Sequence, residues 1–257
     1  MKVAFEVTSE VGRRAVLLLL GDPLVDKVGV IGTSTKAPRD PRVESLDDAR
    51  GFDLVATDST DPRQAAQTAL VHELPLVTFT DMDPEPAFDR VVQLSGASLG
   101  SGIAPSLAWH EVAQTSEVLE LSIAWTEPGR PLRRGEAVTF PDPVGPRWGV
   151  EVATHPINGI PSRHITVPVE GEWAAAMARV TGAADDGVVQ RVVGVSDLAA
   201  HLEGIALAAG VLTAAAGQFQ PGYATPQDAA EQYLAAALGI GMAVASFTSE
   251  VQRSPRN

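Results

Sequence analysis

Short apolar segments alternate with helical patterns over roughly the first hundred residues, and this alternation constrains the fold more than any other feature of the chain. The apolar segments read as strands because each is short and bounded by turn residues. They cover residues 2–7, 27–33, 53–57, 75–81 and 91–97. Helical segments lie between them, as the crossovers of parallel strands require. The sequence therefore predicts an α/β fold built on a parallel, doubly wound sheet.

The first strand leads directly into a predicted helix. Ser9 can cap this helix by accepting a hydrogen bond from a backbone amide, and Glu10 suits its positively polarised start. The helix runs to about Leu20 and ends at Gly21-Asp22-Pro23, which is a stop signal. A strand, a turn and a capped helix in this order are typical of the opening of a dinucleotide-binding βα unit.

The turn of this unit departs from the glycine fingerprint G-x-G-x-x-G of such sites. With the last glycine placed on Gly12, the first two positions fall on Val7 and Ser9. Val7 is β-branched and cannot adopt a positive φ without strain, whereas the small Ser9 partly replaces the second glycine. Glu6 and Glu10 add negative charge that opposes a phosphate, although the amides at a helix start attract one.

Two loops at the carboxyl ends of the predicted strands add candidates for cofactor binding. The second strand ends without the acidic residue that usually binds the adenosine ribose; its hydroxyls and Lys36 suit the 2′-phosphate of NADP, and a polar surface loop is the alternative. The loop after residues 53–57 lines the ligand crevice of such a sheet. The candidate cofactor-binding residues are Val7, Thr8, Ser9, Val11, Gly12, Thr33, Ser34, Asp58 and Ser59.

The pattern changes after residue 97. A glycine-rich turn leads into a helix near Pro105, and a strand follows over residues 119–125. Two further strand-like runs join at a hairpin turn over 183–187, and two Ala/Leu-rich helices over about 197–216 and 226–247 close the chain. We predict a Rossmann-like domain over residues 1–110. An α+β domain with a mainly antiparallel sheet should occupy 111–257, with the C-terminal helices packing back.

Candidates for chemistry in the second half are few. His110, one turn into the helix after Pro105, is a candidate proton donor, and a structural histidine is the alternative. His155 and His164 flank a predicted exposed connection, and His155 is the second catalytic candidate. Ser106 and Arg147 are candidate substrate-binding residues. Arg147 belongs to a basic cluster that suits a carboxylate, although such clusters also form surface ion pairs.

Composition excludes several classes of function. The formal charge of −13 argues against nucleic acid and against an anionic membrane surface as partners. The chain has no cysteine and no His-x-x-x-His or His-Glu-x-x-His spacing, so we predict no metal site. No secretory signal pattern opens the sequence and no apolar run is long enough to span a bilayer, so we expect a cytoplasmic protein.

Three stretches carry a resemblance to a known family: EVGRRAVLLLL after the first strand, GASLGSGIAPSLAWHEV after the last one, and RRGEAVTFPDPVG with the later ARVTG and GVVQRVVGVSD segments. Nearly the whole chain resembles the saccharopine dehydrogenase-like and related NAD(P)-dependent reductases. The resemblance implies a Rossmann domain joined to an α/β domain whose sheet often serves in dimerisation. It also implies hydride chemistry.

These observations leave two functions open. The first is an NAD(P)-dependent oxidoreductase that acts on a small metabolite at an interdomain cleft and forms a homodimer. The second is a Rossmann-fold protein that has lost ordinary dinucleotide binding, uses no such cofactor, and serves as a ligand-binding, regulatory or partner subunit. Fold alone cannot decide between them.

Overall fold

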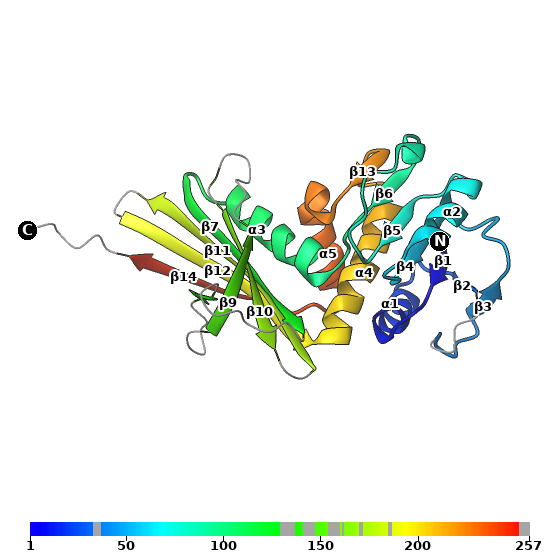
Figure 1. Cartoon of the computed structure of the whole chain (residues 1–257), viewed down its shortest axis with the longest axis horizontal. Coiled ribbons are helices and arrows are strands. Elements are labelled where there is room, and N and C mark those ends of the chain that lie inside the picture. The colour runs from blue at the N-terminus through cyan, green and yellow to red at the C-terminus, as the bar shows by residue number, and fades with distance from the viewer. Residues whose placement is uncertain are drawn as a thin grey trace, which may run out of the picture. The chain divides into compact units, whose positions relative to one another are not determined.

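A computed structural model describes residues 1–32, 37–128, 137–140, 147–153, 160, 162–169, 172–184 and 187–251 (Figure 1). By its internal contacts the chain divides into two compact units. The first comprises Met1–Ile103 and Ala200–Met242, and the second comprises Ala104–Ala199 and Ala243–Asn257. The chain thus leaves the first unit after Ile103 and returns to it from Ala200 to Met242.

The first unit is built on a seven-stranded parallel sheet. Its strand order is β13-β6-β5-β4-β1-β2-β3. The strands are β1 (Lys2–Glu6), β2 (Lys27–Ile31), β3 (Val43–Leu46), β4 (Leu54–Thr57), β5 (Leu76–Thr78), β6 (Val92–Leu94) and β13 (Gly222–Ala224). The order 3-2-1-4-5-6 within it is that of a Rossmann sheet, and the direction of winding reverses between β1 and β4. The predicted α/β fold is therefore confirmed.

Helices cover both faces of this sheet. The helices of the unit are α1 (Glu10–Gly21), α2 (Arg63–His72), α4 (Ala199–Ala215) and α5 (Ala230–Gly239), with short 3-10 turns η1 (Pro86–Phe88) and η3 (Pro226–Ala229). One core cluster joins Leu19 of α1 and Leu207 of α4 to the strands, and a second joins Ala65 of α2 to Leu76. Because α4 is apolar on nearly all sides, it is buried along most of its length.

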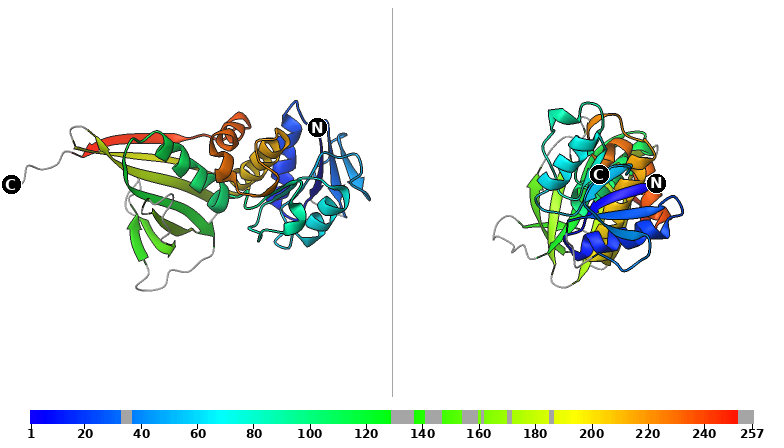
Figure 2. Two further views of the ribbon diagram at one scale, coloured as in Figure 1. Left: turned by 90° about the horizontal axis from the view of Figure 1, so that it is seen from above. Right: turned by 90° about the vertical axis from the view of Figure 1, so that its right-hand side faces the viewer.

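The second unit carries a mixed seven-stranded sheet of order β14-β12-β11-β7-β10-β9-β8. This sheet is drawn in green, yellow and red in the left view of Figure 2. Its strands are β7 (Val118–Pro128), β8 (Ala137–Phe140), β9 (Arg147–Ala153), β10 (Ser162–Val169), β11 (Trp173–Ala184), β12 (Gly187–Leu198) and β14 (Ala245–Val251). The pairs are antiparallel except β7 with β10, which run parallel. The helix α3 (Ala104–Ala113) packs on this sheet.

One local prediction was wrong, and one strand was not predicted. The last helix does not continue to residue 247; it ends at Gly239, and residues Ala245–Val251 form the strand β14 along β12. Gly241 has a φ of +112°, which few other residues adopt, and it breaks the helical pattern there. The edge strand Val43–Leu46, which pairs with β2, is not among the strands predicted from the sequence. In the described part of the chain, no helix is long and apolar enough to cross a membrane.

Candidate functional site

The N-terminus of α1 lies at the point where the winding of the first sheet reverses, because the turn after β1 leads directly into it. Ser9 is the N-cap, as predicted. It has an extended backbone with φ −136° and ψ −179°, and its Oγ accepts a hydrogen bond from the amide of Val11 at 3.1 Å. The carbonyl of Ser9 accepts the first intrahelical bond from Arg13 at 3.2 Å. This is where open α/β sheets bind ligands.

Asp58, which follows β4, reaches beneath this turn. Its carboxylate accepts hydrogen bonds from the backbone amides of Thr8 at 2.6 Å, Ser9 at 2.7 Å and Gly12 at 3.0 Å. The hydroxyls of Thr8 and Ser9 also donate to it. Asp58 is only 4% exposed, so the carboxylate is enclosed by the turn that it holds. The structure thus brings together four of the predicted cofactor-binding residues, around a carboxylate of the protein itself.

Gly12 is required by this arrangement. A Cβ atom at position 12 would lie 2.5 Å from Cγ of Asp58, which is closer than real Cβ contacts come. Val7, by contrast, does not have a positive φ. Among the described residues, Glu73 is the only non-glycine residue that has one. Val7 is 4% exposed and belongs to the core. The turn is therefore formed without the left-handed conformation that the first glycine of the fingerprint permits.

The carboxyl ends of β1 and β4 form an acidic environment. Oε2 of Glu6 accepts a hydrogen bond from Oγ1 of Thr57 at 2.6 Å. Burial raises the pKa of Glu6, the hydrogen bond from Thr57 opposes this rise, and the charges of Asp58 and Asp61 add to it. Glu10, at the start of α1, is paired with Arg13 at 2.7 Å. A polyanion near the turn would meet this negative charge.

The backbone of the turn nevertheless offers a place for a phosphate group. The carboxylate of Asp58 accepts hydrogen bonds from the amides of Thr8, Ser9 and Gly12, and Oγ of Ser9 accepts one from the amide of Val11. Within the described residues, the amide of Glu10 has no hydrogen-bond partner, and Glu10 is exposed. Amides at the first helical positions are those that bind anions. The amide of Glu10 is therefore a candidate anion-binding group, while the nearby carboxylates weaken the binding of an anion.

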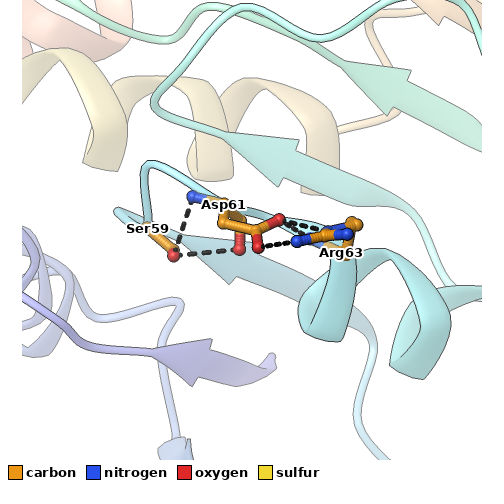
Figure 3. Close-up of polar contacts among 3 residues, drawn as sticks. All are labelled: Ser59, Asp61 and Arg63. Atoms are coloured by element: carbon orange, nitrogen blue, oxygen red, sulfur yellow. Dashed lines mark hydrogen bonds and ion pairs between the residues drawn. The ribbon is translucent and has the colours of Figure 1, made fainter.

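Ser59 lies in a loop that its own hydrogen bonds hold in place (Figure 3). Its Oγ accepts from the amide of Asp61 at 3.1 Å and donates to the carbonyl of Asp61 at 3.0 Å. Arg63 binds the carboxylate of Asp61 through two nitrogens, and these hydrogen bonds lower the pKa of Asp61. The amide of Ser59 donates to Oγ1 of Thr57 at 2.9 Å. The loop after β4 is thus held by hydrogen bonds among its own residues and with Thr57.

The other predicted residues are not part of the contacts described above. Thr33, Ser34 and His155 are outside the described residues, as is Lys36. Arg147 is the first residue of β9, where its backbone pairs with Phe140. These positions stay predictions.

Two predicted residues lie on α3, in the second unit. His110 is exposed and its Nε2 lies 2.6 Å from Nε2 of Gln114. Ser106 is fully buried, and its hydroxyl has no hydrogen-bond partner in the described part of the structure. In the same part, no three His, Asp or Glu side chains are grouped so as to hold a metal ion.

The carboxyl edge of the first sheet also carries groups outside the candidate site residues given above. A one-turn π-helix, η2 (Leu99–Ile103), follows β6 and continues into α3. Ser101 of η2 donates to Oδ2 of Asp81 at 2.8 Å, and the amide of Leu99 donates to Oε2 of Glu203 at 2.7 Å. The small residues of GSGIAP indicated a turn there, but nothing in the sequence pointed to Glu203.

Several solved structures are similar to this chain over most of its length. An engineered D-amino acid dehydrogenase bound to NADP+ matches with a TM-score of 0.61 at 16% identity, covering 91% of this chain and 95% of that one. Homospermidine synthase from Legionella pneumophila, in complex with NAD, matches with a TM-score of 0.60 at 9% identity, covering 96% and 91%. The C. glutamicum DAP dehydrogenase, in complex with DAP, matches with a TM-score of 0.58 at 14% identity, covering 91% and 95%.

These similarities show that the chain shares the two-part α/β fold of these proteins. No protein-family model and no curated protein sequence matches it. The narrower assignment to the saccharopine dehydrogenase-like family rests on the sequence resemblance alone. At such low identity the similarity concerns the fold, so the function has to be argued from the site.

Proposed function

We propose that the chain is an oxidoreductase that uses a nicotinamide dinucleotide to oxidise or reduce a small metabolite. The observation that carries this proposal is the placement of the α1 N-terminus at the reversal point of a Rossmann sheet, with the amide of Glu10 available. The similar structures that contain NADP+ or NAD support it at the level of the fold.

In this proposal the turn from Thr8 to Gly12 holds the pyrophosphate, and the loop of Asp58 and Ser59 borders the cofactor. Thr33 and Ser34 would contact the adenosine ribose, where hydroxyls favour NADP over NAD. The dinucleotide supplies hydride transfer when bound. His110 or His155 would exchange a proton with the substrate, and Arg147 would orient it.

A second candidate function is favoured by the charge of the turn. The carboxylate of Asp58 already satisfies three amides, and the carboxylates of Glu6 and Glu10 stand nearby. A chain with this turn would serve as a ligand-binding, regulatory or partner subunit without an ordinary dinucleotide. The two candidates differ in one measurable property, which is affinity for the dinucleotide.

Thermal shift and calorimetric titration with NAD+, NADH, NADP+ and NADPH separate the candidates. A ligand at 100 times its dissociation constant stabilises the folded chain by about 2.7 kcal/mol. The oxidoreductase proposal expects binding of at least one of the four, with NADPH or NADP+ preferred. If none of the four binds at millimolar concentration, the oxidoreductase proposal fails and the second candidate replaces it.

A matched pair of glycine variants locates the binding. Gly12→Ala places a Cβ against Asp58 and should abolish the dinucleotide signal. Gly21→Ala, at the other end of α1, meets no atom within 4 Å and should leave it unchanged. Equal binding by both variants would place the cofactor away from the turn.

A further inference from the structure

A hollow of about 280 Å³ lies in the second unit, where the end of α3 packs against β11 and β12. Its lining includes Gln114 and Ser116 just after α3, Val180 of β11, and Val189 and Arg191 of β12. Pockets for drug-sized ligands measure about 300–1,000 Å³, so this hollow suits a smaller molecule. All of its lining residues belong to the second unit, and the proposed function gives none of them a role.

Arg191 is the cationic group of this hollow, and its side chain is 36% exposed. Among the described residues, its guanidinium forms no hydrogen bond. The nearest opposite charge is Glu111 of α3, whose Oε2 lies 3.9 Å from Nη1 of Arg191, beyond hydrogen-bond distance. A guanidinium presents five N–H donors in a planar fork. Arg191 therefore has donors available for a ligand.

Glu111 holds this guanidinium in place from the side of the helix. Its side chain is 12% exposed, and in the described part of the chain its carboxylate forms no hydrogen bond. A carboxylate with so little access to water needs a nearby positive charge. The ion pair thus keeps Arg191 beside the hollow, and at 3.9 Å it leaves the N–H groups of the guanidinium unoccupied.

Ser116 adds donors at the rim of the hollow. It is exposed, and within the described residues neither its amide nor its hydroxyl has a hydrogen-bond partner. Gln114, by contrast, is engaged with a neighbour, since its Nε2 lies 2.6 Å from Nε2 of His110. Arg191 and Ser116 therefore both offer donors, and donors that converge on one hollow suit an oxyanion.

Two negative features limit the charge of that anion. The carboxylate of Glu111 lies next to Arg191, and the carbonyl groups at the C-terminal end of α3 carry partial negative charge. A phosphate group is nearly doubly charged at neutral pH and is repelled more strongly than a carboxylate. Beside Arg191 the lining is apolar, because Val180 and Val189 contribute to it. These features favour a monocarboxylate with a short aliphatic body.

We propose that this hollow is a binding site for a small aliphatic monocarboxylate, in which Arg191 binds the carboxylate while Val180 and Val189 pack against the hydrocarbon body. The guanidinium donates two parallel N–H···O bonds to the ligand, which is the strongest arrangement open to this pair of groups. Ser116 supplies a further donor. Because every lining residue belongs to the second unit, the inference does not depend on a dinucleotide or on the proposed function.

Methyl NMR of the full chain, titrated with sodium isobutyrate, tests this site. The methyl signals of Val180 and Val189 should shift saturably, with a dissociation constant on the order of 1 mM for a ligand of this size. Isobutyramide has the same shape and no charge. It should bind at least about tenfold more weakly, because hydrogen bonds between two charged groups are the stronger ones. Inorganic phosphate should also bind more weakly than isobutyrate.

A pair of arginine variants locates the binding. Arg191→Gln should weaken the binding of isobutyrate at least about tenfold, whereas Arg90→Gln, at an exposed arginine of the first unit, should bind it as wild type does. The proposal is overturned if isobutyrate at tens of millimolar causes no saturable shift, if isobutyramide or phosphate binds as tightly, or if Arg191→Gln binds as wild type does. Should Arg191→Gln fail to fold, the comparison of isobutyrate with isobutyramide on the wild-type chain still decides.

Discussion

The carboxylate of Asp58 lies 3.0 Å from the backbone amide of Gly12, although the two residues are 46 positions apart in the chain. The parallel pairing of β1 with β4 brings them together, since it places the ends of both strands at the same edge. Asp58 thereby satisfies amides that a glycine-rich turn would leave for a ligand. In this turn an acidic side chain at the end of the neighbouring strand binds the backbone amides. In the usual glycine fingerprint, the turn instead relies on the conformational freedom of glycine.

Replacing Asp58 should cost much of the stability of the first unit. Asp58→Ala leaves the amides of Thr8, Ser9 and Gly12 without their acceptor, and each unsatisfied buried amide costs about 1–3 kcal/mol. Because Thr8 is exposed and water can reach its amide, we expect a total loss of about 2–4 kcal/mol in urea unfolding. Asp61→Ala, at an exposed carboxylate in the same loop, should leave stability nearly unchanged. Similar losses in both variants would contradict the structural role given to Asp58.

Gly12 and Gly21 should respond in opposite directions to the same substitution. At position 12 the added methyl group overlaps Asp58, and overpacking of this kind costs about 1–3 kcal/mol. At position 21 nothing lies within 4 Å and the φ angle is ordinary, so Gly21→Ala should raise helix stability by about 0.5–1 kcal/mol. Thermal unfolding of both variants measures the difference. An unchanged melting temperature for Gly12→Ala would show that the turn can move away from Asp58.

The architecture of the first unit could be predicted because its signals are local. Buried parallel strands such as Leu54–Thr57 are continuous apolar runs, and the start of α1 is marked by the cap Ser9 and its end by Gly21 and Pro23. Short edge strands carry no such signal. Val43–Leu46 and Gly222–Ala224 are strands because β2 and β6 pair with them, and that pairing is decided by tertiary structure.

The candidate site could be predicted in position but not in its contacts. The acidic residue at the end of a strand marked Asp58 as a crevice residue, and the cap marked Ser9, yet the bond between them depends on the adjacency of β1 and β4. Glu203 could not be found in the same way. A lone glutamate in an apolar helix gives no sign of the partner it meets, and Leu99 is 104 positions away.

The homodimer stays a proposal from the sequence, and the second unit offers a way to test it. β14 is an edge strand of the second sheet, and its Phe247 is 55% exposed. Unpaired edges and exposed apolar side chains are common at subunit interfaces. Sedimentation velocity should show a dimer at micromolar concentration, and Phe247→Lys should shift it toward monomer. A monomeric wild type at 100 µM would contradict the proposal, whatever the variant does.

The titration of Glu203 should make the free energy of unfolding of the chain depend on pH. The pKa of Glu203 is raised by burial to about 7 in the folded chain, whereas in the unfolded chain it returns to an ordinary 4.5. The folded state therefore binds the proton more tightly. The contribution of Glu203 is fully present below pH 4.5, declines between 4.5 and about 7, and is lost above that range. The decline amounts to at most about 3 kcal/mol, since each pKa unit is worth about 1.4 kcal/mol.

The measurement is the difference in unfolding free energy between wild type and Glu203→Gln at a series of pH values. Glu6, whose pKa is also raised, contributes equally to both proteins and cancels in the difference. The unfolding free energy of the variant should increase relative to that of wild type between pH 5 and 7. From pH 7.5 upward the difference should stay constant. A difference that is flat across this range, or that grows as pH falls, would show that Glu203 is not protonated preferentially in the folded chain.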